Sequence, residues 1–579
     1  MNLPERARTF LQSGAWLDWL AATLIACGSA GVVFWQNARL AVLWDLSYIL
    51  ENAQRIALGD LPYRDFPFPY PPLTFLVQAL LIKISGRVFF HHVIYCAVIG
   101  GLATLITWRI LLHTLSGTAG ARVLALLLTV PLTVLGIYAI FPHPFYDPDC
   151  TFFLLICLLL LLQWQRKPSP IRSLLTGTLL VVPLFIKQNG GLAFLGSTIL
   201  ALGVLVAVAF FRHDSVARFL WLLLGIILSL TSAALAIHLT VGLSNYLHWT
   251  ITFAAARRTP ALAEMVGIYR DGLLKWWLTA FFAGFLLLRL DRRSSQIFKV
   301  LSLGLFSLPF VWTVAYLFID HDPSERAERL LSLWPLLLII ALVAALIRIR
   351  KTCSFSSATP FILLATVHGA FLSQQLWGST YALWPLFMII VANTYIGFAL
   401  QTNKRFVVWP LFLVIAWALL LSGTFYMRSH ERLDYANLGE GELVHSRLAP
   451  LRGLSMRGSW IPDFEELVAY TEKEIPRQDG VLMIPGEDLF YFSTGRRPRL
   501  PVLMFDHTVN PYMPEEVLAL VRTRDVQWLI VKDELQLEEE PVEQKEVLMN
   551  LLLQEFEEVE SLNNYEVYHR KSAESEDEP

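Results

Sequence analysis

Long apolar runs recur from the start of the chain to about residue 425. Each run is close to the length of about 20 residues with which a helix crosses a hydrocarbon core of roughly 30 Å. Inside lipid every backbone N–H and C=O group needs a partner within the protein, and a helix supplies one for each. We therefore predict an all-α polytopic membrane region of about 13 helices. Its spans are expected at residues 16–35, 92–112, 122–141, 150–164, 173–188, 190–211, 219–241, 274–289, 300–319, 330–348, 356–372, 382–400 and 407–425.

The composition supports this class and argues against two others. The 579 residues are 55% hydrophobic and 16% charged, whereas soluble globular proteins carry roughly 25% charged residues. A net charge of −2 gives no basis for nucleic-acid binding. The five cysteines lie in or beside predicted spans or in a short basic loop. They therefore indicate neither a disulfide-stapled exterior domain nor a metal site.

The distribution of Lys and Arg predicts the orientation. The first 14 residues are basic, and no small-residue cleavage pattern follows the first apolar run, which favours an uncleaved anchor. Cytoplasmic loops are enriched in Lys and Arg, and with the N-terminus inside, all compact basic loops fall on that side. These are Arg166–Arg172, Arg212–Arg218, Arg289–Lys299, Arg348–Lys351 and Lys404-Arg405.

The region from about residue 426 then lies outside the cell membrane. The exterior segments contain no Asn-X-Ser/Thr sequon, which is consistent with a bacterial host. We expect a multi-pass protein of the bacterial inner membrane, with a cytoplasmic N-terminus and a periplasmic C-terminal domain.

The first exterior loop, residues 36–91, is long and contains two short helical patterns. Ile49–Leu58 and Leu73–Ile84 are predicted to lie in the interface plane, and prolines between residues 62 and 72 separate them. Alternatively, residues 73–84 form a true span. That arrangement would invert every later loop and place the basic clusters outside.

Charged residues gather in the other exterior loops as well. The second loop contains two acids, the turn before the sixth span contains a lysine, and the fourth and fifth loops contain arginines. These residues are Asp147, Asp149, Lys187, Arg257, Arg258 and Arg329.

Several of these elements occur in the order found in a known family. The first loop reads Trp44-Asp45, then Tyr48, then Gly59–Phe66 and Tyr70–Leu73. It resembles the first exterior loop of the type-C glycosyltransferases, in the branch of the protein O-mannosyltransferases and the lipid A aminoarabinose transferase. The acidic second loop, the Lys187-Gln188 turn, Arg329 before the tenth span and the thirteen-span layout agree. The resemblance covers roughly residues 15–425.

The resemblance implies transfer of a sugar from a polyprenyl-phosphate donor, with inversion, to a lipid, glycan or protein acceptor outside. Asp45 occupies the family's position for the general base, and Asp147 and Asp149 are further catalytic candidates. Cations or a divalent metal would stabilise the departing phosphate; no resident cofactor follows from the sequence. The candidate phosphate ligands are Lys187, Arg257, Arg258 and Arg329, and the candidate substrate-loop residues are Tyr63, Asp65 and Tyr70.

Each candidate also has a structural explanation. Asp45 has a structural alternative, a helix end that faces water, but within this motif we favour catalysis. The two acids of the second loop are explained equally by a turn with a helix cap. Lys187 would snorkel to the interface, and the arginine pair of the fourth loop would bind lipid headgroups. The residues before Pro71-Pro72 are Phe68-Pro69-Tyr70, whereas related transferases often carry a charged pair there. Donor phosphate must then be held differently in this chain.

The C-terminal region, residues 426–570, is predicted to be a small exterior α/β domain. Two β-like runs, 481–485 and 528–531, alternate with helical patterns at 463–475, 514–523 and 543–558. The stretch Pro485–Arg497 either contacts substrate above the membrane or caps the domain, and we favour the second. Residues 571–579 are acidic and predicted to be a disordered tail.

Two other functions are compatible with a polytopic membrane protein. A secondary transporter would have repeated halves, interrupted helices and charges near the bilayer centre, and neither an obvious repeat nor such charges are present in the sequence. A non-catalytic scaffold would have no reason to gather acids and bases on one membrane face, although a catalytically degenerate transferase would retain them. We therefore favour the transferase.

Overall fold

The computed structural model describes most of the chain. It covers residues 15–571 except 214, 259–262, 264–265, 291–294, 320–321, 323–324, 327–328, 352–353, 373–381, 403–407, 434, 507 and 538–541. The predicted cytoplasmic N-terminus, the basic pair Lys404-Arg405 and the acidic tail from residue 572 lie outside the described residues.

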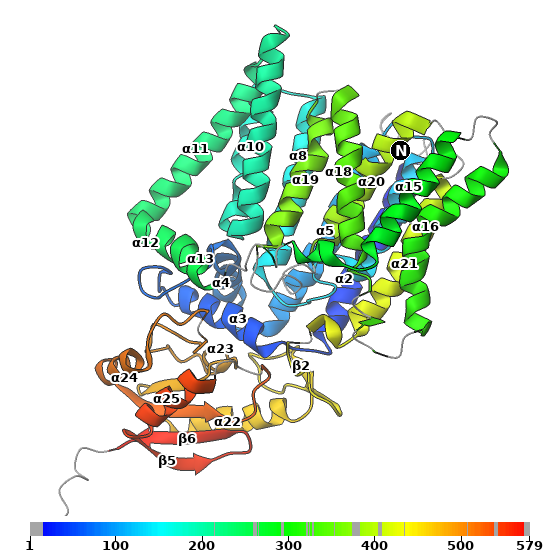
Figure 1. Cartoon of the computed structure of the whole chain (residues 1–579). Helices are drawn as coiled ribbons and strands as arrows, with labels where there is room; N and C mark the ends of the chain where they lie inside the picture. The colour runs from blue at the N-terminus through cyan, green and yellow to red at the C-terminus, as the bar shows by residue number, and fades with distance from the viewer. Residues whose placement is uncertain are drawn as a thin grey trace, which may run out of the picture.

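Helices form the region that was predicted to cross the membrane (Figure 1). Among the described residues, eight helices are long and apolar enough to be spans. They are α2 (Ala15–Asn37), α5 (Phe89–Thr114), α8 (Tyr146–Arg166), α10 (Gln188–Phe211), α11 (Ala217–Thr240), α16 (Gln296–Ile319), α18 (Leu333–Lys351) and α21 (Val408–Arg428). The fold is that of a multi-pass helical membrane protein.

Four more predicted spans also coincide with apolar helices. Three are the helices α15 (Leu274–Leu290), α19 (Phe355–Ala370) and α20 (Trp384–Thr402). The fourth is α9 (Pro170–Leu179), which is continued by the 3₁₀ turn η1 (Val182–Phe185).

The remaining predicted span, residues 122–141, is broken. α6 (Ala121–Thr129) ends just before Pro131, and α7 (Leu132–Leu135) is followed by Gly136. Proline lacks the N–H that would continue the helix and clashes with the preceding turn. Residues 136–145 then form a buried loop that leads into α8. The apolar pattern therefore predicted burial correctly but the conformation wrongly.

Two helices of the first loop lie where the bundle meets the C-terminal domain (Figure 1). They are α3 (Leu43–Ala57) and α4 (Leu73–Ser85), and they pack on each other. α4 has 13 residues, which is about 20 Å of helix and shorter than a hydrocarbon core of roughly 30 Å. α5 begins at the same end, because Phe89 N donates to Pro450 O of the C-terminal domain at 2.8 Å. α4 therefore does not carry the chain across the bundle.

The C-terminal domain contains a four-stranded sheet in the order β3-β4-β6-β5. β3 (Gly480–Ile484) is parallel to β4 (Val526–Lys532), and β6 (Tyr565–Arg570) is antiparallel to β4 and to β5 (Phe556–Ser561). The predicted β-like runs are β3 and β4. The other elements are η6 (Glu431–Leu433), the hairpin β1 (Leu443–His445) with β2 (Ser455–Arg457), and the helices α22 (Trp460–Glu474), α23 (Phe490–Thr494), α24 (Pro514–Thr523) and α25 (Val542–Leu552).

The helix predicted over residues 543–558 is wrong at its end. α25 stops at Leu552, and β5 begins at Phe556. β5 is the edge strand of the sheet, and only Phe556 of its residues is buried. The alternation of buried and exposed residues that identifies a strand is absent, so its acidic sequence resembled the exposed face of a helix.

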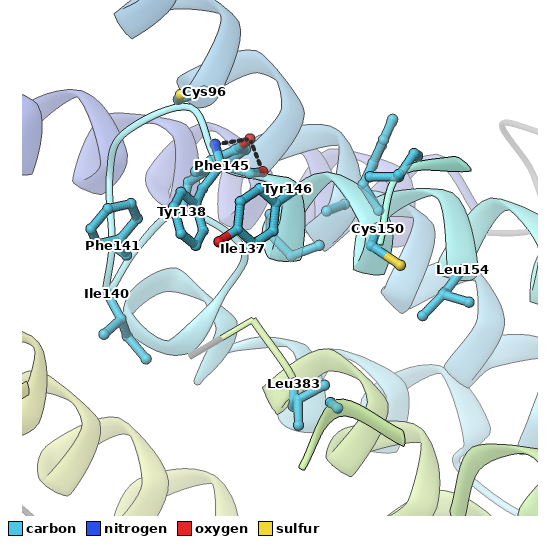
Figure 2. Close-up of a cluster of buried hydrophobic side chains, with 14 of the residues drawn as sticks. Cys96, Ile137, Tyr138, Ile140, Phe141, Phe145, Tyr146, Cys150, Leu154 and Leu383 are labelled. Atoms are coloured by element: carbon cyan, nitrogen blue, oxygen red, sulfur yellow. Dashed lines mark hydrogen bonds between the residues drawn. The ribbon is translucent and has the colours of Figure 1, made fainter. Parts of the chain in front are cut away.

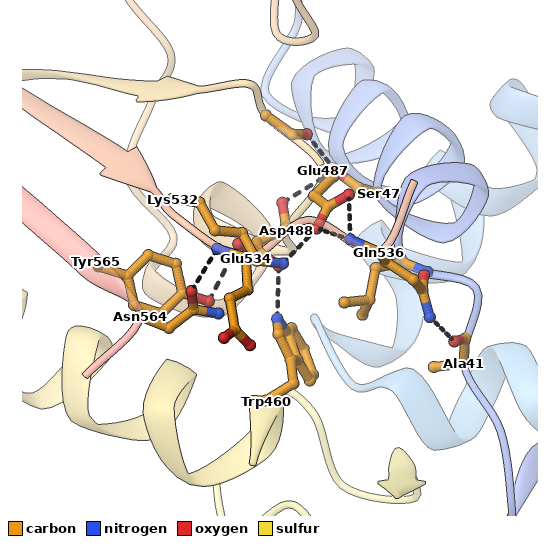
Figure 3. Close-up of polar contacts among 12 residues, drawn as sticks. Ala41, Ser47, Trp460, Glu487, Asp488, Lys532, Glu534, Gln536, Asn564 and Tyr565 are labelled. Carbon is orange, nitrogen blue, oxygen red and sulfur yellow. Dashed lines mark hydrogen bonds and ion pairs between the residues drawn. The ribbon is translucent and has the colours of Figure 1, made fainter. Parts of the chain in front are cut away.

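The C-terminal domain docks on α3 through buried polar groups (Figure 3). Gln536 Nε2 donates to Ala41 O at 2.8 Å, and Ser47 Oγ donates to Asp488 O at 2.9 Å. Both oxygens of the Glu51 carboxyl group accept from Phe492 N at 3.0–3.1 Å. Residues 485–497 were considered either as a substrate contact or as a cap of the domain. In the structure they hold the domain against the membrane region.

A buried cluster of charges supports this docking segment. Lys532 pairs with Glu487 and, at 3.0 Å, with Asp488. Trp460 Nε1 donates to Asp488 Oδ1 at 2.7 Å, and Tyr565 donates its hydroxyl hydrogen to Asp488 Oδ2 at 3.1 Å. Burial raises the pKa of Glu487, while Lys532 opposes that rise.

Candidate active site

Asp45 lies in the first turn of α3, at the boundary between the bundle and the C-terminal domain. Its side chain is partly exposed, whereas most of α3 is buried. Tyr435, from the segment after α21, donates its hydroxyl hydrogen to Asp45 Oδ2 at 2.8 Å. A solvent-accessible carboxylate that is held in one orientation suits a general base. The sequence reasoning missed Tyr435, because 390 positions separate the two residues.

Neutral side chains fix the backbone just before Asp45. His143 Nε2 accepts from Val42 N at 3.3 Å, so the other ring nitrogen, Nδ1, carries the proton and donates to Asn37 Oδ1 at 3.1 Å. Burial, followed by the charge of Arg432, lowers the pKa of His143 to about 3. At pH 7 this histidine is neutral. Through its two hydrogen bonds it connects the buried loop 136–145 to the end of α2 and the start of α3.

Arg432 of η6 is a buried cation in the same neighbourhood. Its side chain lies near His143, and its charge also interacts with the phenols of Tyr426 and Tyr435. Burial lowers the pKa of Arg432 to about 10, which leaves it charged at pH 7. The sequence reasoning missed Arg432, because nothing in the linear sequence indicates that this arginine is buried.

Lys187 is enclosed by aromatic rings and paired with an acid. Its Nζ lies 3.2 Å from Asp147 Oδ2 and 4.1 Å from the ring centroid of Tyr146. Tyr70 of the first loop stacks on Tyr146 with centroids 4.3 Å apart. The structure thus brings three predicted site residues, Tyr70, Asp147 and Lys187, into one cluster, and the charge of the lysine is already balanced there.

Asp149 accepts hydrogen bonds from three hydroxyl groups. Tyr95 and Tyr138 donate to Oδ1, each at 2.7 Å, and Thr74 donates to Oδ2 at 2.8 Å. The acid therefore ties α4, α5 and the buried loop 136–145 to α8, and it does not cap α8, whose N-cap residue is Phe145. Figure 2 shows Tyr138 packed beside Phe145 at this junction. The geometry is that of a structural anchor.

The two remaining residues of the predicted substrate loop differ in burial. Tyr63 is buried and donates its hydroxyl hydrogen to Tyr70 O at 2.6 Å. Asp65 lies in a surface turn, where it accepts from Leu61 N at 2.8 Å and pairs with Arg64 at 2.8 Å. The hydrogen bond from Arg64 lowers the pKa of Asp65. Tyr63 therefore shapes the loop, and Asp65 stabilises its turn.

Of the arginines that were predicted to bind phosphate, the two whose side chains are described, Arg257 and Arg329, do not join the Lys187 cluster. Arg257 Nη1 donates to Asn510 O of the C-terminal domain at 2.7 Å. Arg329 pairs with Glu325 at 2.6 Å and lies over the Tyr316 ring at 4.3 Å. The side chain of Arg258 lies outside the described residues.

In the part of the chain that the structure describes, the acidic candidates of the site do not fit a divalent metal. Among the described residues, no group of three or more His, Cys, Asp or Glu side chains is placed to bind an ion. Asp147 is paired with Lys187, and the oxygens of Asp149 are taken by hydroxyl groups. No catalytic step through a metal is derived from these residues.

A cavity of about 740 Å³ lies at the opposite end of the bundle. Its walls include His113 at the end of α5, Arg166 at the end of α8 and Arg348 near the end of α18. α5 has 26 residues and so extends about 39 Å from the C-terminal domain to this cavity. The cavity is therefore separate from Asp45.

Comparisons with known proteins find likeness in structure only. No protein-family model and no curated protein matches the chain. ArnT from Cupriavidus metallidurans, solved with undecaprenyl phosphate, is 12% identical with a TM-score of 0.46; the match covers 97% of this chain and 99% of that one. The Archaeoglobus fulgidus oligosaccharyltransferase tethered to an acceptor peptide is 9% identical with a TM-score of 0.49, over 96% and 74% of the two chains. At these identities the likeness concerns the fold alone.

Proposed function

We propose that this chain is an integral-membrane glycosyltransferase that uses a polyprenyl-phosphate sugar and acts at the membrane face beside its C-terminal domain. The observation that carries the proposal is the geometry of Asp45, a partly exposed carboxylate at this boundary that Tyr435 orients at 2.8 Å. The first-loop residues that resemble the type-C glycosyltransferases support it. They include Asp45 itself and the Tyr70 that packs against the Lys187 cluster.

The proposed reaction is a single displacement with inversion. The acceptor hydroxyl oxygen attacks the anomeric carbon of the sugar while the Asp45 carboxylate takes the hydroxyl proton. The bond between the anomeric carbon and the phosphate oxygen breaks, and its electron pair leaves with the polyprenyl phosphate. A cation near that oxygen stabilises the developing charge. Water then removes the proton from Asp45.

The predicted topology completes the proposal. With the N-terminus in the cytoplasm, the C-terminal domain and Asp45 face the periplasm of a bacterial inner membrane. The start of α2 and the C-terminal domain lie at opposite ends of the bundle (Figure 1), which supports this arrangement. Donor and acceptor would meet at the outer leaflet.

The test is transfer of labelled sugar from a panel of polyprenyl-phosphate donors by purified protein in lipid. Asp45→Asn keeps the shape of the side chain but cannot accept the proton, so we expect a rate loss of about a hundredfold or more. Asp525→Asn, an exposed acid next to β4, is the matched control and should leave the rate unchanged.

Each other outcome has a definite meaning. Full activity of Asp45→Asn would show that another group is the base, with Asp147 as the next candidate. Absence of transfer from every donor would contradict the proposal and favour a transporter or a degenerate scaffold.

A further inference from the structure

Among the residues that the structure describes, the buried lysines and arginines have partners, with one exception. Among the described residues, the Lys and Arg side chains that are buried are Arg55, Lys187, Arg432, Arg496 and Lys532. Arg55 pairs with Asp60 at 2.8 Å. Lys187 and Lys532 also pair with acids, and Arg496 donates to three backbone carbonyl groups.

Arg432 is the exception. Its side chain is 7% exposed, and its Nε and Nη1 atoms are enclosed without a hydrogen-bond partner among the described residues. Removing a charge from water without an opposite charge costs several kcal/mol. An anionic ligand that reached the guanidinium would offset this cost by supplying the missing charge and hydrogen-bond acceptors.

The surroundings of Arg432 indicate which ligand this is. η6 begins three residues after the end of α21, the last apolar helix of the bundle, so Arg432 belongs to the segment that leaves the membrane region, at the depth where the phosphate of a membrane lipid resides. Its near neighbours include Tyr435, which contacts Asp45, and the neutral His143. The guanidinium group suits phosphate because it offers several N–H donors in a planar fork.

We propose that Arg432 is the principal cation that binds the phosphate of the polyprenyl-phosphate donor. This inference rests on the proposed function and replaces the predicted role of Lys187, whose charge Asp147 already balances at 3.2 Å. It also explains how this chain dispenses with charged residues at Phe68-Pro69-Tyr70. The phosphate contact comes from the segment after the last span instead of the first loop.

The inference is tested by direct binding, without sugar transfer. Purified protein in phosphatidylcholine nanodiscs is titrated with undecaprenyl phosphate, and affinity is measured by native mass spectrometry and by the shift in Tm. Undecaprenol, which lacks the phosphate, and phosphatidylglycerol, which offers an anionic headgroup, are the comparison ligands. Arg428→Met removes an exposed arginine at the end of α21 and is the matched control.

We expect Arg432→Met to weaken undecaprenyl phosphate binding at least tenfold and Arg432→Lys to retain part of the affinity. Arg428→Met should bind like the wild type. Without ligand, Arg432→Met should have a Tm equal to or above the wild-type value, because an unpaired buried charge has been removed. A residue with a purely structural role would show a lower Tm and unchanged affinity.

Several results would overturn the inference. Unchanged affinity in Arg432→Met overturns it and leaves the proposed function standing, as does a loss of binding confined to Lys187→Met. Equal binding of phosphatidylglycerol assigns Arg432 to a lipid headgroup and also overturns it. If the wild type binds no undecaprenyl phosphate, this inference and the donor class of the proposed function both fail.

Discussion

Tyr435 shows how one hydrogen bond could set the efficiency of a base. Its hydroxyl donates to Asp45 at 2.8 Å, and a hydrogen bond to a charged group contributes about 1.5–3 kcal/mol. We expect Tyr435→Phe to lower kcat for sugar transfer roughly tenfold, less than Asp45→Asn, with KM and Tm almost unchanged. Steady-state kinetics measure kcat and KM, and thermal unfolding measures Tm. An unaltered kcat would show that the orientation of Asp45 does not depend on this tyrosine.

Asp149 provides the contrast, because its three hydroxyl donors mark a structural group. Asp149→Ala leaves the hydroxyl groups of Tyr95, Tyr138 and Thr74 without their acceptor. We expect a loss of roughly 3 kcal/mol or more of stability and a clear fall in Tm, while the molecules that remain folded keep their transfer rate. Glu557→Ala, exposed on β5, is the control. A large loss of rate at an unchanged Tm would instead make Asp149 catalytic.

At the scale of elements, α3 is held at both of its faces by other parts of the chain. α4 packs along it on the membrane side, and α23 and the segment before it contact it from the C-terminal domain. The position of Asp45 therefore depends on how firmly the domain is docked. Glu51 is the buried acid at this contact.

Glu51 makes the docking sensitive to pH. Burial raises its pKa from 4.5 to about 8. Between these values the folded protein keeps a proton that the unfolded chain has lost, so stability falls as pH rises, by up to about 1.4 kcal/mol per pH unit. Above about pH 8 both forms are ionised and this slope ends.

Glu51→Gln removes this ionisation. We expect its Tm to exceed that of the wild type by a margin that grows from pH 4.5 to 8 and then stays constant. Glu557→Gln, exposed on β5, should follow the wild type throughout. Parallel Tm profiles for wild type and Glu51→Gln would contradict the expectation.

For the whole molecule, the central prediction concerns sidedness. In a cysteine-free background, Glu557→Cys in the C-terminal domain should react with a membrane-impermeant maleimide in intact spheroplasts. Ser215→Cys, in the loop between α10 and α11, should react only after permeabilisation, because that loop lies at the other end of the bundle (Figure 1). The reverse pattern would invert the predicted topology.

The sequence predicted most of the fold because its strongest signals are local. Apolar runs marked the helices, and the helical pattern at 514–523 coincides with α24, which Pro514 opens and whose first turn contains two glutamates. The break at Pro131 was missed, since the loop after it is as apolar and buried as a span. β5 was missed because it shows no alternation.

The site was less predictable because its contacts are distant in sequence. The pairing of Asp147 with Lys187 joins the first turn of α8 to the N-cap of α10, and a resemblance could suggest both residues but not that they neutralise each other. Tyr435 and Arg432 gave no signal, because a polar stretch after a final span is common. Their roles appear only once α21 places them beside α3.

The contact between Tyr435 and Asp45 also has a consequence for biosynthesis. The two residues are 390 positions apart, so every intervening helix must be synthesised and inserted into the membrane before they can meet. A nascent chain that already holds the first loop in the membrane still lacks the group that orients its carboxylate. On the proposed function, a partly synthesised copy would therefore act on lipid-linked sugar more slowly than the finished protein, and the full rate would follow only when the segment after α21 has folded.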